Sequence, residues 1–523
     1  MTLARSAGVT GVATLTSRIL GLVRDQVLAA LFGAGSDMDA FIVAFRIPNL
    51  VRDLFAEGAM SAAFVPTFTR RLTIDGKDDA WRLGNNLINA LIVVTGALVI
   101  AGLVFAAPLV GAYARDFSSV PGKLELTITL TRVMLPFLTM VAVAAAVMGM
   151  LNSLHHYFIP AVSPALFNVA TIAGAFALAP VMPALGLPRI TAIAIAALAG
   201  GALQVLVQWP SLHAEGFRYQ PRLDFKDPGL HQVLILMGPG TVGLAATQVN
   251  LFVNTLLATS QGTGAVSWLS YAFRLMYLPI GLFGVSIATA TLPAVSRHAA
   301  IDDRTGIRHT VADAMAMMMV LNVPATLGLA VLAEPIVRLL FERGRFLASD
   351  TAATAAALRF YAVGLVGYAT ARIASPVFYA LRRSRVPVIV SITTIAVNIA
   401  MNVALVRVLG FRGLALGTSI AMIANGAALL VLLRRHLEGL DERRLTATLA
   451  KIIVASCLMA AASFGVERVL SATMPGPQLL TQAVRLFAAI GAGLVVLGVS
   501  AKLLRVHEFD EALSGIKARL IHL

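Results

Sequence analysis

Charged side chains interrupt the otherwise apolar stretch from Ser17 to Pro66, and their types define the chemistry available there. Outside its short break at residues 34–38, the stretch holds four arginines and four carboxylates, namely Arg18, Arg24, Arg46 and Arg52 with Asp25, Asp39, Asp53 and Glu57. A charge at the bilayer centre costs about 2.5–3.5 kcal/mol, so four arginines would cost on the order of 10 kcal/mol without a water-filled cavity or partners. These residues are therefore candidates for a functional site.

The arginines of this stretch favour binding of an anion. Arginine keeps its proton, and its planar guanidinium binds two phosphate oxygens at once, so several arginines together would suit a diphosphate. Arg18 and Asp25 are seven residues apart, as are Arg46 and Asp53, which places each pair on one helical face. The alternative is mutual neutralisation. With Arg274 included and the break at 34–38 left out, five arginines face four carboxylates, and this small surplus leaves both interpretations open.

The composition is typical of a membrane protein. The chain has 523 residues, of which 58% are hydrophobic and 13% charged, and its mean hydropathy is +0.84. Apolar runs near 20 residues recur without period-two alternation, which predicts transmembrane helices. The single cysteine, Cys457, excludes an intrachain disulfide and a cysteine-based metal site. The segment after Arg5 is only mildly apolar, so we expect a first helix rather than a cleavable signal.

These runs predict an all-α polytopic membrane protein with about 14 transmembrane helices, forming two pseudo-symmetric six-helix lobes and two C-terminal helices. The expected spans are roughly 9–33, 39–65, 86–113, 128–151, 157–180, 189–212, 231–259, 266–292, 312–333, 352–380, 387–406, 413–433, 447–466 and 480–501. Lysine and arginine gather in alternate loops, which predicts that both termini are cytoplasmic. The same topological role accounts for the net charge of +15 without a nucleic-acid partner.

An internal duplication supports the two lobes. The triplet 44–46 matches 272–274, and 54–55 matches 282–283, each pair 228 residues apart. An even number of spans in each copy makes the repeats parallel, and sites in such proteins lie at the repeat interface near the bilayer midplane. The predicted division is 1–222 for the N-terminal lobe, 223–440 for the C-terminal lobe and 441–523 for the two extra helices.

Three asparagines lie inside predicted spans. Asn398 and Asn402 are one helical turn apart, and Asn254 lies in an earlier span. Their carbonyl oxygens could coordinate a cation, or the side chains could form hydrogen bonds between helices. The pattern leaves both roles open.

Four long motifs carry a resemblance to a known family. They are SRILGLVRD, FGAGSDMDAF, FRIPNLVRDLFAEGAMSAAFVP and VSWLSYAFRLMYLPIGLFGVSIATATLP. They resemble the MurJ (MviN) family of bacterial lipid II flippases, and the resemblance runs over essentially the full length. This family belongs to the MOP exporter superfamily. The resemblance therefore implies a pair of six-helix lobes, alternating access and a groove, made by the last two helices, for a polyprenyl tail.

The resemblance also implies roles for individual residues. The substrate-binding positions that match are Arg18, Arg24, Arg52, Arg274, Asp39, Ser17 and Ser267, and the gate positions are Asp25 and Glu57. Among them, Arg24, Arg52 and Arg274 match the arginines that hold the lipid diphosphate. Two departures stand out. Phe273 replaces an acidic residue of some relatives, and asparagines 254, 398 and 402 replace the aspartates of a sodium site, so no metal is predicted.

The expected function is transport of lipid II from the inner to the outer leaflet of the bacterial cytoplasmic membrane, without covalent chemistry or a cofactor. Its partners would be lipid II (the undecaprenyl-diphosphate-linked disaccharide-pentapeptide) and membrane lipids, with no nucleic acid, and the protein would act as a monomer. An alternative is a flippase for another polyprenyl-diphosphate-linked oligosaccharide of the O-antigen type. An exporter of cationic drugs would need an acidic cavity. A membrane enzyme would need metal-binding carboxylates or a histidine base, and the sequence has no such motif.

Overall fold

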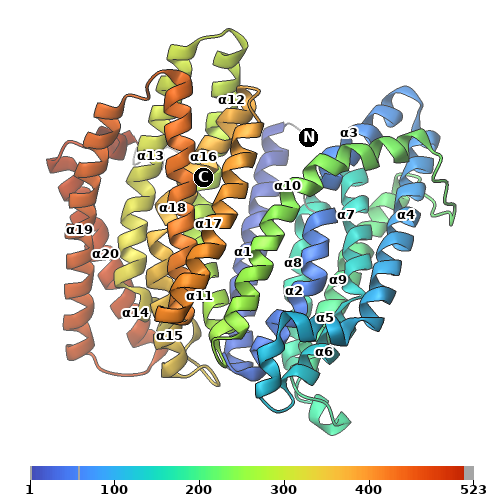
Figure 1. The fold of residues 1–523 in the computed structure, drawn as a ribbon, viewed down its shortest axis with the longest axis horizontal. Helices are drawn as coiled ribbons and strands as arrows, with labels where there is room; N and C mark the ends of the chain where they lie inside the picture. Colours follow the sequence, from blue (N-terminus) through green and yellow to red (C-terminus); the bar gives the residue numbers. More distant parts are fainter. Residues whose placement is uncertain (1–2, 57–58, 512–523) are drawn as a thin grey trace. The chain divides into compact units, whose positions relative to one another are not determined.

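The computed structural model describes residues 3–56 and 59–511, and within them the chain forms only helices and their connections (Figure 1). This confirms the predicted all-α class. The chain divides into two compact units, each described by itself. The first comprises residues 1–267 with 343–346, and the second comprises 268–342 with 347–523. The predicted division at 222/223 and 440/441 follows the sequence duplication and stays a prediction.

The first unit contains the helices that carry most of the charged N-terminal stretch. They are α1 (Leu3–Phe32), α2 (Ser36–Ala56), α3 (Ala59–Ile74), α4 (Lys77–Val104), α5 (Ala106–Tyr113), η1 (Arg115–Ser119), α6 (Lys123–Met134), α7 (Phe137–Ser153), α8 (Phe158–Ala177), η2 (Met182–Leu185), α9 (Thr191–Ala214) and α10 (Pro228–Thr259). Aromatic rings fill the core between α3 and α4. Trp81 packs against Phe68 and against Phe217, with ring centroids 5.8 and 5.4 Å apart.

The second unit begins within α11 and ends with two long helices. Its elements are α11 (Ala265–Pro279), the π-helical turn η3 (Ile280–Gly284), α12 (Val285–Ala300), α13 (Arg304–Val331), α14 (Ala333–Phe341), α15 (Ala348–Val363), α16 (Leu365–Ala380), α17 (Arg385–Leu409), α18 (Phe411–Leu437), α19 (Glu442–Thr473) and α20 (Leu479–Leu503). Helices α19 and α20 run side by side (Figure 1). Helices α16 and α18 approach closely because Gly367 has no side chain: a Cβ there would lie 2.5 Å from Cα of Ile423.

Many of these helices can span a membrane. In the described part of the chain, nine spans are long and apolar enough by length and composition: α4, α6 with α7, α8, α9, α13, α17, α18, α19 and α20. Helices α15 and α16 pass the same test together, with a bend of 44° between them. These helices confirm a multi-pass membrane protein, whereas the number of 14 spans stays a prediction.

The segment between α9 and α10 is held against α4 by three asparagines. Asn85 and Asn86 each donate to one carbonyl and accept from one backbone amide of residues 218–224, at 2.7–3.0 Å. Asn89 donates to the carbonyl oxygens of Gln220 and Arg222, at 2.7 and 2.9 Å, and its own oxygen accepts from the Tyr219 hydroxyl. Residues 218–224 belong to no helix, and these bonds from asparagine side chains satisfy backbone groups that would otherwise lack partners within the protein.

The start of α10 follows from the local sequence. The carboxylate of Asp227 accepts hydrogen bonds from the amides of Gly229 and Leu230, so it caps the first turn. Pro228 occupies the first helical position, where its missing amide hydrogen costs nothing. Arg71 of α3 donates to the same carboxylate at 2.7 Å and thereby joins the end of α3 to the start of α10.

Candidate functional site

Arg24 is held in place near the middle of α1. Its Nε and Nη2 donate to Asp25 Oδ1 at 3.1 and 2.9 Å, and its Nη1 donates to Asn168 Oδ1 on α8 at 3.0 Å. Asn168 in turn donates to the carbonyl oxygen of Ser17 at 3.1 Å. The Arg24 side chain is 16% exposed and that of Asp25 is 7% exposed. Packing of α1 on α8 therefore fixes the direction of this guanidinium.

The other arginines of the N-terminal stretch differ in their surroundings. Arg18 is exposed on α1. Arg46 is half-buried on α2, and its Nε is buried without a hydrogen-bond partner among the described residues. Arg52 also lies on α2, but its side chain is outside the described residues, as is Glu57. Asp25 forms an ion pair with its neighbour Arg24 on the same helix.

Asp39 is the most completely bonded carboxylate of the predicted site. It is 0% exposed and accepts from Lys123 Nζ at 2.9 Å and from the Gly264 amide at 2.7 Å. Ser267 donates twice to Asp39 Oδ1, through its amide at 3.0 Å and its hydroxyl at 2.7 Å. Lys123 is itself buried, and its Nζ lies 3.9 Å from the centroid of the Phe117 ring. Two residues predicted for the site, Asp39 and Ser267, are therefore in direct contact.

This arrangement follows from where each group lies in the fold. Asp39 is in the first turn of α2, Lys123 is the first residue of α6, and Gly264 and Ser267 flank the first turn of α11. The first amides of a helix lack acceptors within the helix and carry partial positive charge, so a carboxylate is a favourable partner. The cluster thus ties together the beginnings of three helices.

Arg274 lies on α11 in the second unit, where it is exposed. Its neighbour Phe273 stacks on Tyr277 with ring centroids 6.1 Å apart and meets the edge of Tyr361 at 5.5 Å. Tyr277 also contacts Tyr368 of α16, with ring centroids 5.7 Å apart. Arg274 therefore belongs to an aromatic part of α11, while Arg24 and Asp39 belong to the first unit. Their convergence on one ligand stays a prediction.

The asparagines of α17 bond to each other. Asn402 Nδ2 donates to Asn398 Oδ1 at 3.0 Å, and both residues are 0% exposed. Gly417 of α18 makes room for them, since a Cβ there would lie 2.1 Å from Asn402 Oδ1. This bond lies within one helix. The two roles predicted for the asparagines, hydrogen bonds between helices and coordination of a cation, stay predictions. Among the residues that the structure describes, no group of three or more His, Cys, Asp or Glu side chains could hold a metal ion.

Sequence reasoning missed two of these partners. Lys123 follows a glycine in the connection before the predicted span 128–151 and carries no motif that would point to Asp39. Asn168 carries no sequence signal that would point to Arg24 or Ser17, although it bonds to both the Arg24 side chain and the backbone of Ser17. Both partnerships join residues 84 or more positions apart.

An all-helical, multi-pass bundle with bonded arginines and carboxylates among its apolar helices has the architecture of a membrane transporter. Residues 28–481 match the family model for the lipid II flippase MurJ. The chain is 34% identical over 497 residues to the probable lipid II flippase MurJ of Bdellovibrio bacteriovorus, covering 93% of each chain. The chain therefore belongs to the MurJ family.

Solved structures agree with this assignment. The structure matches a lipid II flippase MurJ in an inward closed conformation with a TM-score of 0.77 and 26% identity, covering 95% of this chain and 99% of the other. An inward-facing multidrug resistance MATE transporter of the MOP superfamily matches with a TM-score of 0.68 and 17% identity, covering 83% and 99% of the two chains, and shares the fold. The predicted family is thus confirmed, and the MATE transporter supports the fold.

Proposed function

We propose that this protein is a flippase that moves lipid II from the inner to the outer leaflet of the bacterial inner membrane by alternating access. The observation that carries the proposal is membership of the MurJ family over residues 28–481. It favours lipid II over the O-antigen type of cargo, because the relatives with 34% identity or more over most of the chain carry the name lipid II flippase. Transport by this route needs no covalent chemistry and no cofactor.

In this proposal the arginines bind the diphosphate of the lipid. Arg24, Arg52 and Arg274 are the proposed ligands, with Arg18 nearby, because a guanidinium matches two phosphate oxygens at once. The bonds of Arg24 to Asp25 and Asn168 support a preorganised role, since a side chain that is already fixed loses less entropy when it binds a ligand.

Asp39 and Ser267 are proposed to belong to the substrate-binding site, and Asp25 and Glu57 to the gate. The bonds of the Asp39 cluster add a further proposal, that this cluster also closes the outer end of the transport path. In the orientation predicted from the loop charges, the starts of α2, α6 and α11 all lie on the outer side of the membrane. When its four hydrogen bonds are intact, the Asp39 carboxylate holds the starts of these three helices together and thereby closes the outer end of the transport path. Opening would require Asp39 to exchange the bonds from Gly264 and Ser267 for bonds with water or the headgroup. Both termini are proposed to be cytoplasmic, and the protein is proposed to work as a monomer.

The test is depletion of this protein in cells that have no other lipid II flippase, followed by measurement of the leaflet that lipid II occupies. Accumulation of lipid II in the inner leaflet, with recovery on re-expression, is the expected result. Appearance of lipid II outside at the normal rate would overturn the proposal. Parallel measurement of an O-antigen-type carrier lipid distinguishes the two cargoes, because only the true cargo should remain inside.

A further inference from the structure

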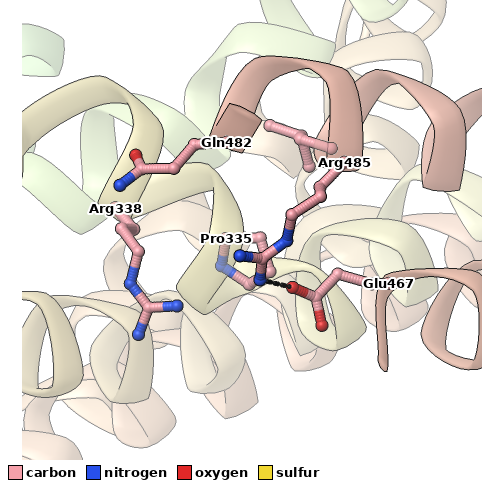
Figure 2. A pocket seen from close by; sticks show the side chains of 6 residues that line it. Pro335, Arg338, Glu467, Gln482 and Arg485 are labelled. Atoms are coloured by element: carbon pink, nitrogen blue, oxygen red, sulfur yellow. Dashed lines mark hydrogen bonds and ion pairs between the residues drawn. The ribbon is translucent and has the colours of Figure 1, made fainter. Parts of the chain in front are cut away.

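A small cavity lies in the second unit where α14, α19 and α20 meet. It is lined by Pro335, Arg338, Glu467, Gln482, Arg485 and Leu486 (Figure 2). Its empty space amounts to about 210 Å³ when the part that is open to the outside is counted, and the enclosed part is much smaller. None of its residues belongs to the site predicted for the diphosphate. Arg338, Arg485 and the amide of Gln482 supply hydrogen-bond donors to this small space, beside the carboxylate of Glu467.

Arg485 is the buried residue of this cavity. It is only 9% exposed, and its Nη2 donates to Glu467 Oε1 at 2.8 Å. Its Nε is buried and has no hydrogen-bond partner among the described residues. A buried donor without an acceptor costs free energy of folding. An acceptor atom from a bound molecule would remove this cost at Arg485 Nε. In Figure 2, Arg338 and Gln482 lie on the side of Arg485 that faces away from Glu467.

Arg338 forms the opposite wall. Its Nη2 donates to Glu334 Oε1 at 2.7 Å, and its Nε lies 3.5 Å from Glu342 Oε2. A guanidinium has five N–H groups, and the hydrogen bond to Glu334 uses one of them. The only carboxylate that lines the cavity in the described chain is Glu467, and it is already paired with Arg485. The cavity is therefore rich in donors, which suits a ligand with several acceptor oxygens.

The cavity lies near the connected ends of α19 and α20, which in a membrane-spanning pair would meet the headgroup region. Glu467 precedes the end of α19 by six residues, and Arg485 follows the start of α20 by six residues. At 1.5 Å per residue, both lie about 9 Å from their helix ends. Leu480 and Phe487 of α20 are 76% and 66% exposed, so apolar surface for acyl chains adjoins the arginines.

We propose that this cavity binds the phosphate of a membrane phospholipid, whose acyl chains lie along the exposed apolar face of α20. Arg338 and Arg485 supply the charge-assisted hydrogen bonds to the phosphate oxygens, and the Gln482 side chain borders the same space. In the orientation proposed above, this end of α19 and α20 faces the outer leaflet. The site is separate from the predicted diphosphate site and does not depend on the transported cargo.

The experiment measures lipid binding to the purified full chain in detergent by native mass spectrometry. The probes are phosphatidylglycerol and diacylglycerol with the same acyl chains, which lacks the phosphate. We expect phosphatidylglycerol to bind more tightly than diacylglycerol. Arg338→Gln and Arg485→Lys should each weaken phosphatidylglycerol binding by about tenfold, because each removes charge-assisted hydrogen bonds. Arg485→Lys keeps the charge beside Glu467, and Arg338 lies near the surface, so both variants should fold.

Arg359→Gln is the matched control. Arg359 contacts Glu334 at 3.7 Å but does not line the cavity, so binding should change by less than about twofold. Equal binding of the two lipids, or wild-type affinity in both cavity variants, would overturn the proposal.

Inorganic phosphate is the probe of a second binding experiment. If it binds alone with the same dependence on Arg338 and Arg485, and phosphatidylglycerol does not bind, the ligand is free phosphate and the lipid assignment is wrong. Failure here leaves the leaflet assay for lipid II unaffected.

Discussion

Ser267 donates two hydrogen bonds to one oxygen of Asp39, although the two residues are 228 positions apart in the chain. Both are 0% exposed, and Lys123 completes the cluster with an ion pair of 2.9 Å. A buried charge without its partner is far more costly than the intact pair. This relationship makes the start of α2 the best place to test how charge, stability and transport are connected.

Replacing Asp39 should destabilise the protein strongly. Asp39→Asn keeps the size of the side chain but leaves Lys123 as an uncompensated buried cation, so we expect a loss of about 3–5 kcal/mol. Thermal unfolding in detergent measures this loss. The double variant Asp39→Asn, Lys123→Met should recover more than about 1 kcal/mol of it, because the stranded charge is gone. Equal stability of the single and double variants would show that the ion pair contributes nothing.

Arg274→Lys should impair transport although the positive charge is retained. A lysine ammonium cannot bind two phosphate oxygens in the planar arrangement of a guanidinium. We expect a drop in lipid II transport of about tenfold or more. Complementation of cells that depend on this protein alone measures the effect, and Arg359→Lys, at a residue outside the predicted site, is the control. Normal growth of the Arg274→Lys strain would contradict bidentate binding.

Asn168 should act through Arg24. Asn168→Leu removes the acceptor of Arg24 Nη1 and the bond to the Ser17 carbonyl oxygen. Transport should fall by about tenfold because the guanidinium is no longer held in one direction. Asn168→Asp retains an acceptor oxygen and should retain more activity. A leucine variant that transports lipid II like the wild type would show that Arg24 needs no support from α8.

Asn89 should stabilise the connection between α9 and α10. Asn89→Leu loses the bonds to the carbonyl oxygens of Gln220 and Arg222 and to the Tyr219 hydroxyl. At about 1 kcal/mol for each hydrogen bond, the expected loss is about 3 kcal/mol. Limited proteolysis of residues 217–227 and thermal unfolding measure it. Ser118→Ala, which removes one exposed hydrogen bond, should change stability by less than about 0.5 kcal/mol.

Acid should weaken the contact at the end of α9. A hydrogen bond from His156, and then one from Lys77, lowers the pKa of Glu215 below its ordinary value of 4.5. A carboxyl whose pKa is lowered in the folded state stabilises the protein above its unfolded pKa, and this contribution is lost as the pH falls through the folded pKa. Glu215→Gln should therefore lower the unfolding temperature at pH 7 but make no difference below the folded pKa. An effect that is independent of pH would contradict this assignment.

Local properties of the chain were sufficient to predict its class. Apolar runs of about 20 residues report on the preference of a single helix for lipid, so the all-α multi-pass character did not depend on knowing the packing. The motifs around Arg24 and Asp39 identified the family in the same way, because they are continuous in sequence. Helical periodicity placed Asp25 on the face of Arg18 but predicted no partner for it, and in the structure the side chain of Arg24 reaches Asp25.

The sequence alone therefore determined that this chain lies in a membrane, is helical, belongs with the MurJ flippases and carries candidate charges on its first two helices. Only the tertiary structure decided the partners of those charges: Lys123 and Ser267 for Asp39, Asn168 for Arg24 and Glu467 for Arg485. The physical reason is distance. Hydropathy is a property of neighbouring residues, but a hydrogen bond requires two atoms within about 3 Å, and which helices meet that closely depends on the packing of the whole bundle.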